Sequence, residues 1–579
     1  MRCRDVLLLL AAAAALNACS KSGAPAPTPV SQAAAPAATS ATEQPMPTMP
    51  APATLQQWAH GAMLFDGLGS FHRPVTTNSK DAQRYFDQGM RLLWGFNHDE
   101  SARSFAQAAL LDPQCAMCYW GLALTVGPNY NLPMMAQARA KVAFDAERSA
   151  KDRASAATPV ERALIDALSK RYPSAQALDP SNSAPVLAAY AQAMAGVARR
   201  FPDDLDVQTL YAESMMNINA WKLWSADHKP APGTLKITHT LEAVLRRDPN
   251  HPGANHYYVH AMEASGHPEK ALISAQRLAG MMPAAGHMDH MPAHIMQLVG
   301  RYEDAAEANR RGAAADVAYF AKTTPPDYYA MYTAHNYQFL AYSAAMEGRR
   351  TETLQAVQSL RAAVPDSMLL AMPGFDWQIA TRYAAMVRFG VWDQLLSEPA
   401  PDPRLPALTA GYLYGKGVAE AALGQVTAAE ATLAQLRQLT DGLPADATAG
   451  FNSAKDVFQL AALMVQARIA DAQGRADDAI TQLRRAADAE DALAYDEPSD
   501  WFFPARHVLG AKLLAAGQPA AAEAVYRTDL QRNPHNGWSL HGLALALTAQ
   551  HRTAEAATVE KQLQLAWQHA DVRPSASAY

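Results

Sequence analysis

The chain has 579 residues, with 49 Lys and Arg against 55 Asp and Glu, a formal net charge of -6 and a pI near 6.3. A chain of this length exceeds what one compact core usually holds, so we expect several domains or one repeat array. The slightly acidic balance and the lack of a long Lys/Arg run exclude nucleic acid as the expected main partner.

The first residues are typical of a secretory signal. MRCRDVLLLLAAAAALNAC contains two Arg, an apolar run from Val6 to Leu16, and small residues before Cys19. The apolar run is too short to span a membrane as a helix. An ordinary cleaved signal would give a free periplasmic protein, and a lipoprotein signal would give an anchored one.

The stretch Leu16-Asn17-Ala18-Cys19 resembles the lipobox of bacterial lipoproteins, in which the cysteine is acylated and becomes the mature N-terminus. This resemblance implies a lipoprotein signal over 1–19 with acylated Cys19, and a cell-envelope protein held by lipid alone. Ser20, in place of Asp, implies the outer membrane, facing the periplasm. Residues 20–54 are rich in Ala, Pro, Ser and Thr, which predicts a disordered tether before a folded part at 55–579.

The folded part shows a recurring pattern of small, aromatic and Pro residues. Gly89, Ser101, Phe105, Ala108 and Pro113 share their spacing with Gly510, Ala522, Tyr526, Asp529 and Pro534, and GRYEDA, GRADDA and GQPAAA recur as turns. Small residues let paired helices approach, and a large residue four positions later fills the next groove.

This pattern resembles the tetratricopeptide repeat, a helix–turn–helix unit of about 34 residues. The resemblance implies an all-α fold, an α-solenoid of about nine to eleven units forming a right-handed superhelix between Leu55 and Trp567. Longer connections are expected near Thr323–Tyr329 and Asn219–Gly233. In this family the first helix of each unit lines the concave side.

Histidine recurs in step with these repeats. His256 and His260 are followed one repeat later by His290 and His294, and residues three, four and seven apart share a helix face. We expect stripes on three successive first helices to face the groove, while Tyr258, Pro292 and Leu340 pack inward. The stripes comprise His256, His260 and Glu263, then His287, His290 and His294, then His335 with Gln338 and Tyr342.

Neighbouring first helices lie close enough for these imidazoles to share an ion. Two His four residues apart can chelate one metal, so the cluster predicts a transition-metal site for Zn, Cu, Fe or Ni rather than Ca or Mg. Asp289 and nearby Met residues are candidates for an additional ligand or an outer shell. Without metal, the same rows would bind an acidic peptide or anion, respond to pH, or simply pack. His507 and His541 recur in the same frame without a second His, and we interpret them as groove polarity.

Cys115 and Cys118 remain after the signal cysteines are set aside. They begin an expected helix, where a thiol pKa is lowered, so a disulfide, a metal dithiolate and a redox centre are all compatible with the spacing. Tyr119 stands where a c-type haem motif needs His. We favour the disulfide because the signal directs the chain to an oxidising compartment.

The sequence contains no HExxH, GxSxG, GxxxxGK[ST] or GxGxxG motif, so we expect a protein that is more a binder than an enzyme. CAMCYWGLAL, HYYVHAMEAS and DEPSDWFFPARHVLGAKLLAAGQ resemble an uncharacterised bacterial group of tetratricopeptide-repeat lipoproteins, which supplies no reaction. The leading hypothesis is an envelope lipoprotein whose groove holds a protein or peptide and a transition metal, as a scaffold or in metal handling. The alternatives are a scaffold that grips peptides without metal, and a periplasmic metalloenzyme using the His/Glu cluster.

Overall fold

The computed structural model describes residues 52–579, apart from 180, 324–328 and 373. The expected signal at 1–19, acylated Cys19 and nearly all of the expected tether therefore lie outside the described residues. So does most of the expected connection near Thr323–Tyr329. The first described helix, α1, begins at Leu55.

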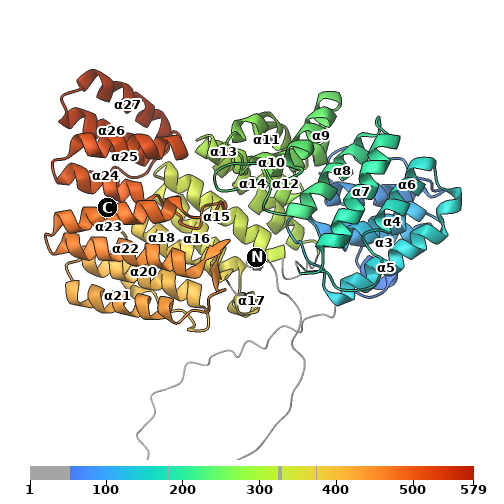
Figure 1. The fold of residues 1–579 in the computed structure, drawn as a ribbon, viewed down its shortest axis with the longest axis horizontal. Coiled ribbons are helices and arrows are strands. Elements are labelled where there is room, and N and C mark those ends of the chain that lie inside the picture. The colour runs from blue at the N-terminus through green and yellow to red at the C-terminus, as the bar shows by residue number, and fades with distance from the viewer. Residues whose placement is uncertain (1–51, 180, 324–328, 373) are drawn as a thin grey trace, which may run out of the picture.

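The described chain is a succession of antiparallel helix pairs, which confirms the predicted all-α solenoid (Figure 1). A single two-stranded hairpin, β1 (Thr448–Ala449) with β2 (Asn452–Ser453), is the only sheet among the described residues. The helices are α1 Leu55–Ala59, α2 Lys80–Trp94, α3 His98–Leu111, α4 Ala116–Thr125, α5 Gln137–Asp152, η1 Ala154–Ala156, α6 Pro159–Leu168, α7 Ala184–Arg200, α8 Leu205–Met216, η2 Asn217–Asn219, α9 Thr234–Arg247, α10 Pro252–Met262, η3 Pro268–Ala271, α11 Leu272–Leu278, α12 Gly286–His290, α13 Pro292–Leu298, α14 Tyr302–Phe320, α15 Ala330–Met346, α16 Arg350–Ala363, α17 Asp366–Ala371, α18 Asp376–Arg388, α19 Trp392–Ser397, α20 Pro406–Ala422, α21 Val426–Asp441, α22 Ala454–Ala472, α23 Ala476–Asp491, α24 Ala505–Ala515, α25 Pro519–Arg532, α26 Gly537–Ala549 and α27 Thr553–Ala566.

The predicted contact between a small residue and an aromatic ring holds the pairs together. A Cβ added to Gly89 on α2 would lie 2.7 Å from the Phe105 ring on α3, and one added to Gly121 on α4 would lie 2.4 Å from the same ring. Near the other end of the chain, Gly510 and Gly542 contact the Tyr526 ring in the same way. One buried ring thus joins its own unit to the next, as the spacing predicts.

The turns between paired helices need glycine. Gly300, between α13 and α14, has φ 75°, and Gly474, between α22 and α23, has φ 74°. A side chain is strained in this left-handed region, whereas glycine adopts it freely. The GRYEDA and GRADDA turns are therefore sites where the backbone itself requires glycine.

The array folds back on itself, so its inner helix faces are covered. Tyr319 on α14 donates a hydrogen bond to Glu100 on α3, with the oxygens 2.9 Å apart. The indole of Trp538 on α26 donates to the carbonyl of Ala345 on α15 at 2.7 Å. Helices α10–α14 consequently lie between the N-terminal and C-terminal helices (Figure 1).

Two connections between helices close over this central region. Residues 220–233 contain no helix, as expected for the Trp- and Pro-rich stretch, and their Trp221 ring lies 5.3 Å from that of Phe451. The connection between α23 and α24 brings Glu497 to the same place, where it contacts His294.

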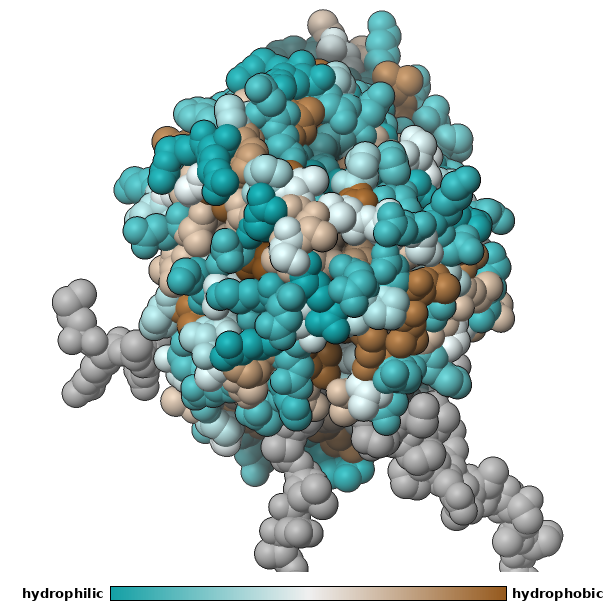
Figure 2. Space-filling view, turned by 90° about the vertical axis from the view of Figure 1, so that its right-hand side faces the viewer, coloured by the Kyte–Doolittle hydropathy of each residue, from teal (hydrophilic) through white to brown (hydrophobic). Residues whose placement is uncertain are grey.

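The outer surface is mainly polar. Figure 2 shows that the end formed by the N-terminal helices is mostly hydrophilic, with small, separate apolar areas. Among the described residues, no helix combines the length and apolar character needed to cross a bilayer.

Candidate metal centre

The seven predicted ligands come from three successive repeat units. His256 and His260 lie on α10, and Glu263 is the residue that caps its C-terminal end. His287 and His290 lie on α12 and His294 on α13, which are separated at Met291. His335 lies on α15. The structure brings all seven into one cluster in the middle of the molecule.

The cluster is enclosed, which corrects the expectation that it lines an open groove. His256 and His290 are 0 % exposed, His260 and His294 are 1 % exposed, and only His335 is partly exposed. Tyr258, Pro292 and Leu340 are buried as well, so the expected contrast between two helix faces does not hold. The repeat period predicts which residues share a face, whereas burial here comes from distant segments that fold over that face.

Aromatic side chains form part of this cover. The Phe96 ring, from the turn between α2 and α3, lies 4.5 Å from the His256 ring and 5.6 Å from the His260 ring. Tyr130 lies 5.2 Å and Trp221 5.8 Å from His260. The imidazoles therefore meet in apolar surroundings, where an unpaired polar atom is costly.

His256, His260 and His287 form the first group of potential ligands, which we call triad 1; one ligand atom from each lies within 4.8 Å of the others. The Nε2 atoms of His256 and His287 face each other at 3.2 Å. The Nδ1 of His256 lies 2.5 Å from the carbonyl of Trp94, to which it donates.

His290, His294 and His335 form the second group, which we call triad 2. One ligand atom from each of these residues also lies within 4.8 Å of the others. The Nε2 atoms of His290 and His294 face each other at 2.7 Å. The Nδ1 of His290 lies 2.6 Å from the Asn309 side-chain oxygen. Both triads thus contain a pair of ring nitrogens directed at each other.

A mixed group of two His and two Glu lies between the triads. Glu263 contacts the Nδ1 of His260 at 3.0 Å with one oxygen and the Nδ1 of His294 at 2.9 Å with the other. Glu497 lies 2.7 Å from the same nitrogen of His294. Sequence reasoning missed Glu497, because it lies in a connection that has no repeat frame; its DEPSD stretch was noted only as part of a family resemblance.

Burial keeps most of these imidazoles neutral. It lowers the pKa of His256 to about 3, and burial together with neighbouring imidazoles lowers those of His260, His287 and His290 well below the ordinary value. Burial also lowers the pKa of His335 to about 3, although the residue is partly exposed. A neutral imidazole has a free lone pair, which is the form that binds a metal.

His294 differs from the other imidazoles, because neighbouring carboxylates raise its pKa. Burial acts to lower the pKa of His294, but Glu497 and Glu263 outweigh it and raise that pKa to about 10. Burial and the neighbouring Glu497 raise the pKa of Glu263 well above its ordinary value, while His294 holds that of Glu497 below its own despite burial. Two buried carboxyls next to several lone pairs form a site with high affinity for a cation.

The arrangement fits a transition metal. In a tetrahedral site with metal–nitrogen bonds of about 2.0–2.1 Å, ligand atoms lie about 3.3 Å apart. The facing Nε2 pairs lie at 3.2 Å and 2.7 Å, and the other potential ligand atoms of each group lie within 4.8 Å of one another. Imidazole nitrogen with carboxylate oxygen suits Zn, Cu, Fe or Ni. Asp289 is not among the potential ligands of the described residues, and its oxygen accepts from the backbone N–H of Gly280 at 3.0 Å.

His507 and His541 lie elsewhere, in the C-terminal units. His507 is 0 % exposed, so its assignment to groove polarity is wrong. Its Nε2 lies 2.9 Å from Asp529, and Arg388 donates to its Nδ1 at 2.7 Å. His541 is partly exposed.

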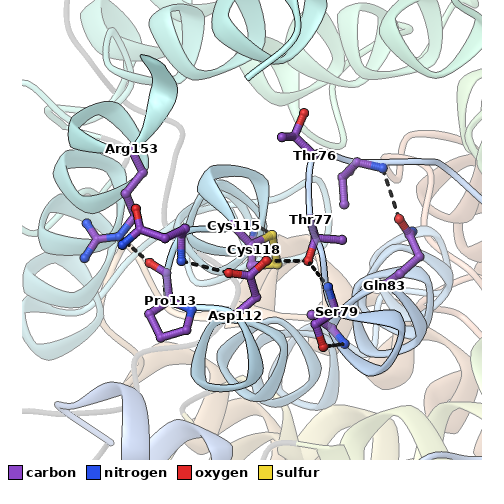
Figure 3. The surroundings of a disulfide bond; sticks show 12 residues. Thr76, Thr77, Ser79, Gln83, Asp112, Pro113, Cys115, Cys118 and Arg153 are labelled. Atoms are coloured by element: carbon purple, nitrogen blue, oxygen red, sulfur yellow. Dashed lines mark hydrogen bonds between the residues drawn. A yellow bond between two sulfur atoms is a disulfide. The ribbon is translucent and has the colours of Figure 1, made fainter. Parts of the chain in front are cut away.

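Cys115 and Cys118 are joined as a disulfide at the start of α4 (Figure 3). Asp112 accepts from the Thr77 hydroxyl beside it, and Arg153 donates to the Pro113 carbonyl at 2.7 Å. Neither sulfur belongs to any group of potential ligands in the described part of the chain. The structure therefore keeps the disulfide separate from the His cluster.

No family model matches the sequence, and no curated protein matches it either. Solved structures with a partial likeness include a human IFIT1 dimer with m7Gppp-AAAA, at 12 % identity and a TM-score of 0.32 over 82 % of this chain and 95 % of that one. The Cut9–Hcn1 hetero-tetramer of the APC/C gives 11 % and 0.28 over 84 % and 90 %. Yeast Tom70 gives 12 % and 0.25 over 84 % and 93 %. Likeness at this level supports no conclusion about what this chain binds.

Proposed function

We propose that this chain is a transition-metal-binding protein whose helical solenoid encloses the metal in its central His/Glu cluster. The observation that carries the proposal is the buried Nε2 of His260, which has no hydrogen-bond partner among the described residues although three other imidazoles surround it. A buried polar atom without a partner costs about 1–3 kcal/mol, and a bound cation would remove that cost.

The paired nitrogens support the same proposal. Two facing Nε2 atoms can form a hydrogen bond only when one of them carries a proton. Each triad contains one such pair of Nε2 atoms. A metal ion would accept both lone pairs at once and displace the proton. Zn, Cu, Fe and Ni are the candidates, because each accepts imidazole and carboxylate ligands.

The surrounding solenoid is proposed to act as a scaffold that takes a protein or peptide partner. Because the His cluster is enclosed, that partner would bind the outer surface rather than the imidazoles themselves.

We place the protein in the cell envelope, anchored in the outer membrane through acylated Cys19 and facing the periplasm. The lipobox-like sequence supports this proposal, and the Cys115–Cys118 disulfide agrees with an oxidising compartment. Cys19→Ser should shift the protein from the membrane pellet to the soluble fraction of cell extracts. A variant that still pellets would contradict lipid anchoring.

Elemental analysis of purified, untagged mature protein tests the metal proposal. The wild type, loaded and then dialysed, should retain at least one ion per chain, and His260→Ala combined with His294→Ala should retain almost none. His267→Ala is the matched control, because that imidazole is 67 % exposed just beyond α10 and should leave the metal content unchanged. If the folded wild type retained no ion, the proposed metal site would be wrong, and only the proposal of a scaffold without metal would remain.

A further inference from the structure

We propose that the centre holds two metal ions, one in each His triad, and that Glu263 contacts a histidine of each triad without binding either ion itself. This inference rests on the metal-binding function proposed above and goes beyond it in the number of ions and in the role of each residue. The ions would be first-row transition metals, each held by three imidazoles.

The three groups of potential ligands overlap at His260 and His294, so one nitrogen cannot serve every group. The two nitrogens of each ring resolve the overlap. Both residues direct Nδ1 at Glu263, which occupies that nitrogen. The Nε2 of His294 faces triad 2, and the Nε2 of His260 is buried and unpartnered within the described structure. Each ring can therefore contact Glu263 and still supply Nε2 to its own triad.

One further member of each triad is oriented in the same way. His256 donates from Nδ1 to the carbonyl of Trp94, and His290 directs Nδ1 at the side-chain oxygen of Asn309. A hydrogen bond at one ring nitrogen fixes the tautomer and leaves the lone pair on the other. Metal-binding histidines show this arrangement, in which a carbonyl or carboxylate holds the nitrogen that faces away from the ion.

A single zinc ion would not use all six imidazoles. Zinc usually binds about four donors, and its catalytic sites often use three imidazoles with the fourth position open. The triads are nevertheless in contact, because the rings of His260 and His294 lie 5.7 Å apart and those of His287 and His290 lie 5.9 Å apart. Two ions would be direct neighbours, with their open positions inside the same enclosed centre.

The buried charges also agree with two ions. Glu263 and Glu497 are 2 % exposed each, and they would provide two negative charges next to the rings that join the triads once a bound ion displaces the proton from Glu263. Those charges would neutralise two monovalent copper ions. They would balance two divalent ions once a hydroxide or another small anion filled each open position.

Counting the ions tests the inference. The wild type is loaded with Zn(II) or Cu(I), dialysed, and analysed for metal and protein. We expect two ions per chain in the wild type and in the His267→Ala control. His256→Ala with His287→Ala should retain one ion, and so should His290→Ala with His335→Ala. Because these variants remove buried side chains, the wild-type count, which needs no substitution, is the primary result.

The Glu263→Gln variant tests whether Glu263 binds a metal ion itself or only holds the histidines that do. An amide keeps one acceptor and loses the other, so the variant should still bind two ions, with at least one of them about 10–100-fold more weakly. X-ray absorption of the loaded wild type should show a first shell dominated by imidazole nitrogen.

Other outcomes would overturn the inference. One ion in the wild type that is lost in Glu263→Gln with Glu497→Gln would assign a single mixed site, while the proposed metal-binding function would stand. Loss of both ions in either triad variant would contradict separate triads. If the folded wild type bound no ion, both the proposed metal-binding function and the inference of two ions would be contradicted.

Discussion

His290 and His507 occupy the same repeat position, each ten residues before its turn glycine, Gly300 and Gly517. Both are 0 % exposed, yet their surroundings differ. The protein satisfies both nitrogens of His507, one through Asp529 and the other through Arg388. His290 directs one nitrogen at another imidazole. His507 thus has a complementary protein partner on both nitrogens, whereas His290 has one on Nδ1 only and its Nε2 faces another imidazole.

Asp529 shows how complete the C-terminal network is. One carboxylate oxygen accepts from the Ser539 hydroxyl at 2.6 Å and from the Asn536 amide at 2.9 Å, while His507 contacts it at 2.9 Å. Burial acts to raise the pKa of Asp529, but His507 and hydrogen bonds from Ser539 and Asn533 hold it below the ordinary value. The carboxylate is stabilised by the protein alone, so this network needs no cation.

The largest expected effect is on stability at the C-terminal network. His507→Ala removes one member of a buried charged network and should cost about 3–5 kcal/mol of unfolding free energy. Urea unfolding measures the loss, and elemental analysis should find the metal content unchanged. A His507→Ala protein that lost its metal would show that the two regions are not independent.

Removing the metal is expected to lower the stability of the protein through the other region, the central His cluster. A ligand present at a thousand times its dissociation constant stabilises the folded state by about 4 kcal/mol. Chelation should therefore lower the unfolding midpoint of the wild type. The His507→Ala variant should show the same difference between loaded and stripped protein. Chelation that left both proteins unaffected would contradict a bound ion.

A smaller effect is expected at Glu497. Glu497→Gln keeps the size of the side chain but removes a buried charge beside His294, which should weaken metal binding about 10–100-fold. Competition with a chelator of known affinity measures the change. Glu490→Gln is a suitable comparison, because this partly buried carboxyl lies on α23 and accepts from the backbone of Ala505, outside the cluster. Equal weakening in both variants would indicate a general effect of buried charge.

Much of the fold was predictable because the repeat pattern is local. Gly89 and Phe105 make the contact that their spacing predicts, and the equivalent pair Gly510 and Tyr526 does the same. The turn glycines, including Gly300, adopt the backbone that the pattern requires. Such contacts lie within one repeat or between neighbours, so a period in the sequence encodes them.

The His cluster was only partly predictable from the sequence, because the residues that enclose it come from distant parts of the chain. The repeat frame identified the six histidines and Glu263 as neighbours. It could not show that Phe96, Trp221 and Glu497 arrive from distant parts of the chain to enclose them. The same limit explains His507, whose burial depends on Arg388 from another unit.

The most direct test of the central claim is the position of metal in crystals of the loaded wild-type protein. Anomalous scattering recorded at the absorption edge of the loaded metal should give two adjacent peaks, each about 2.0–2.1 Å from the Nε2 atoms of one His triad. An anomalous map without a peak at the cluster, in crystals of protein with all six rings in place, would contradict the account.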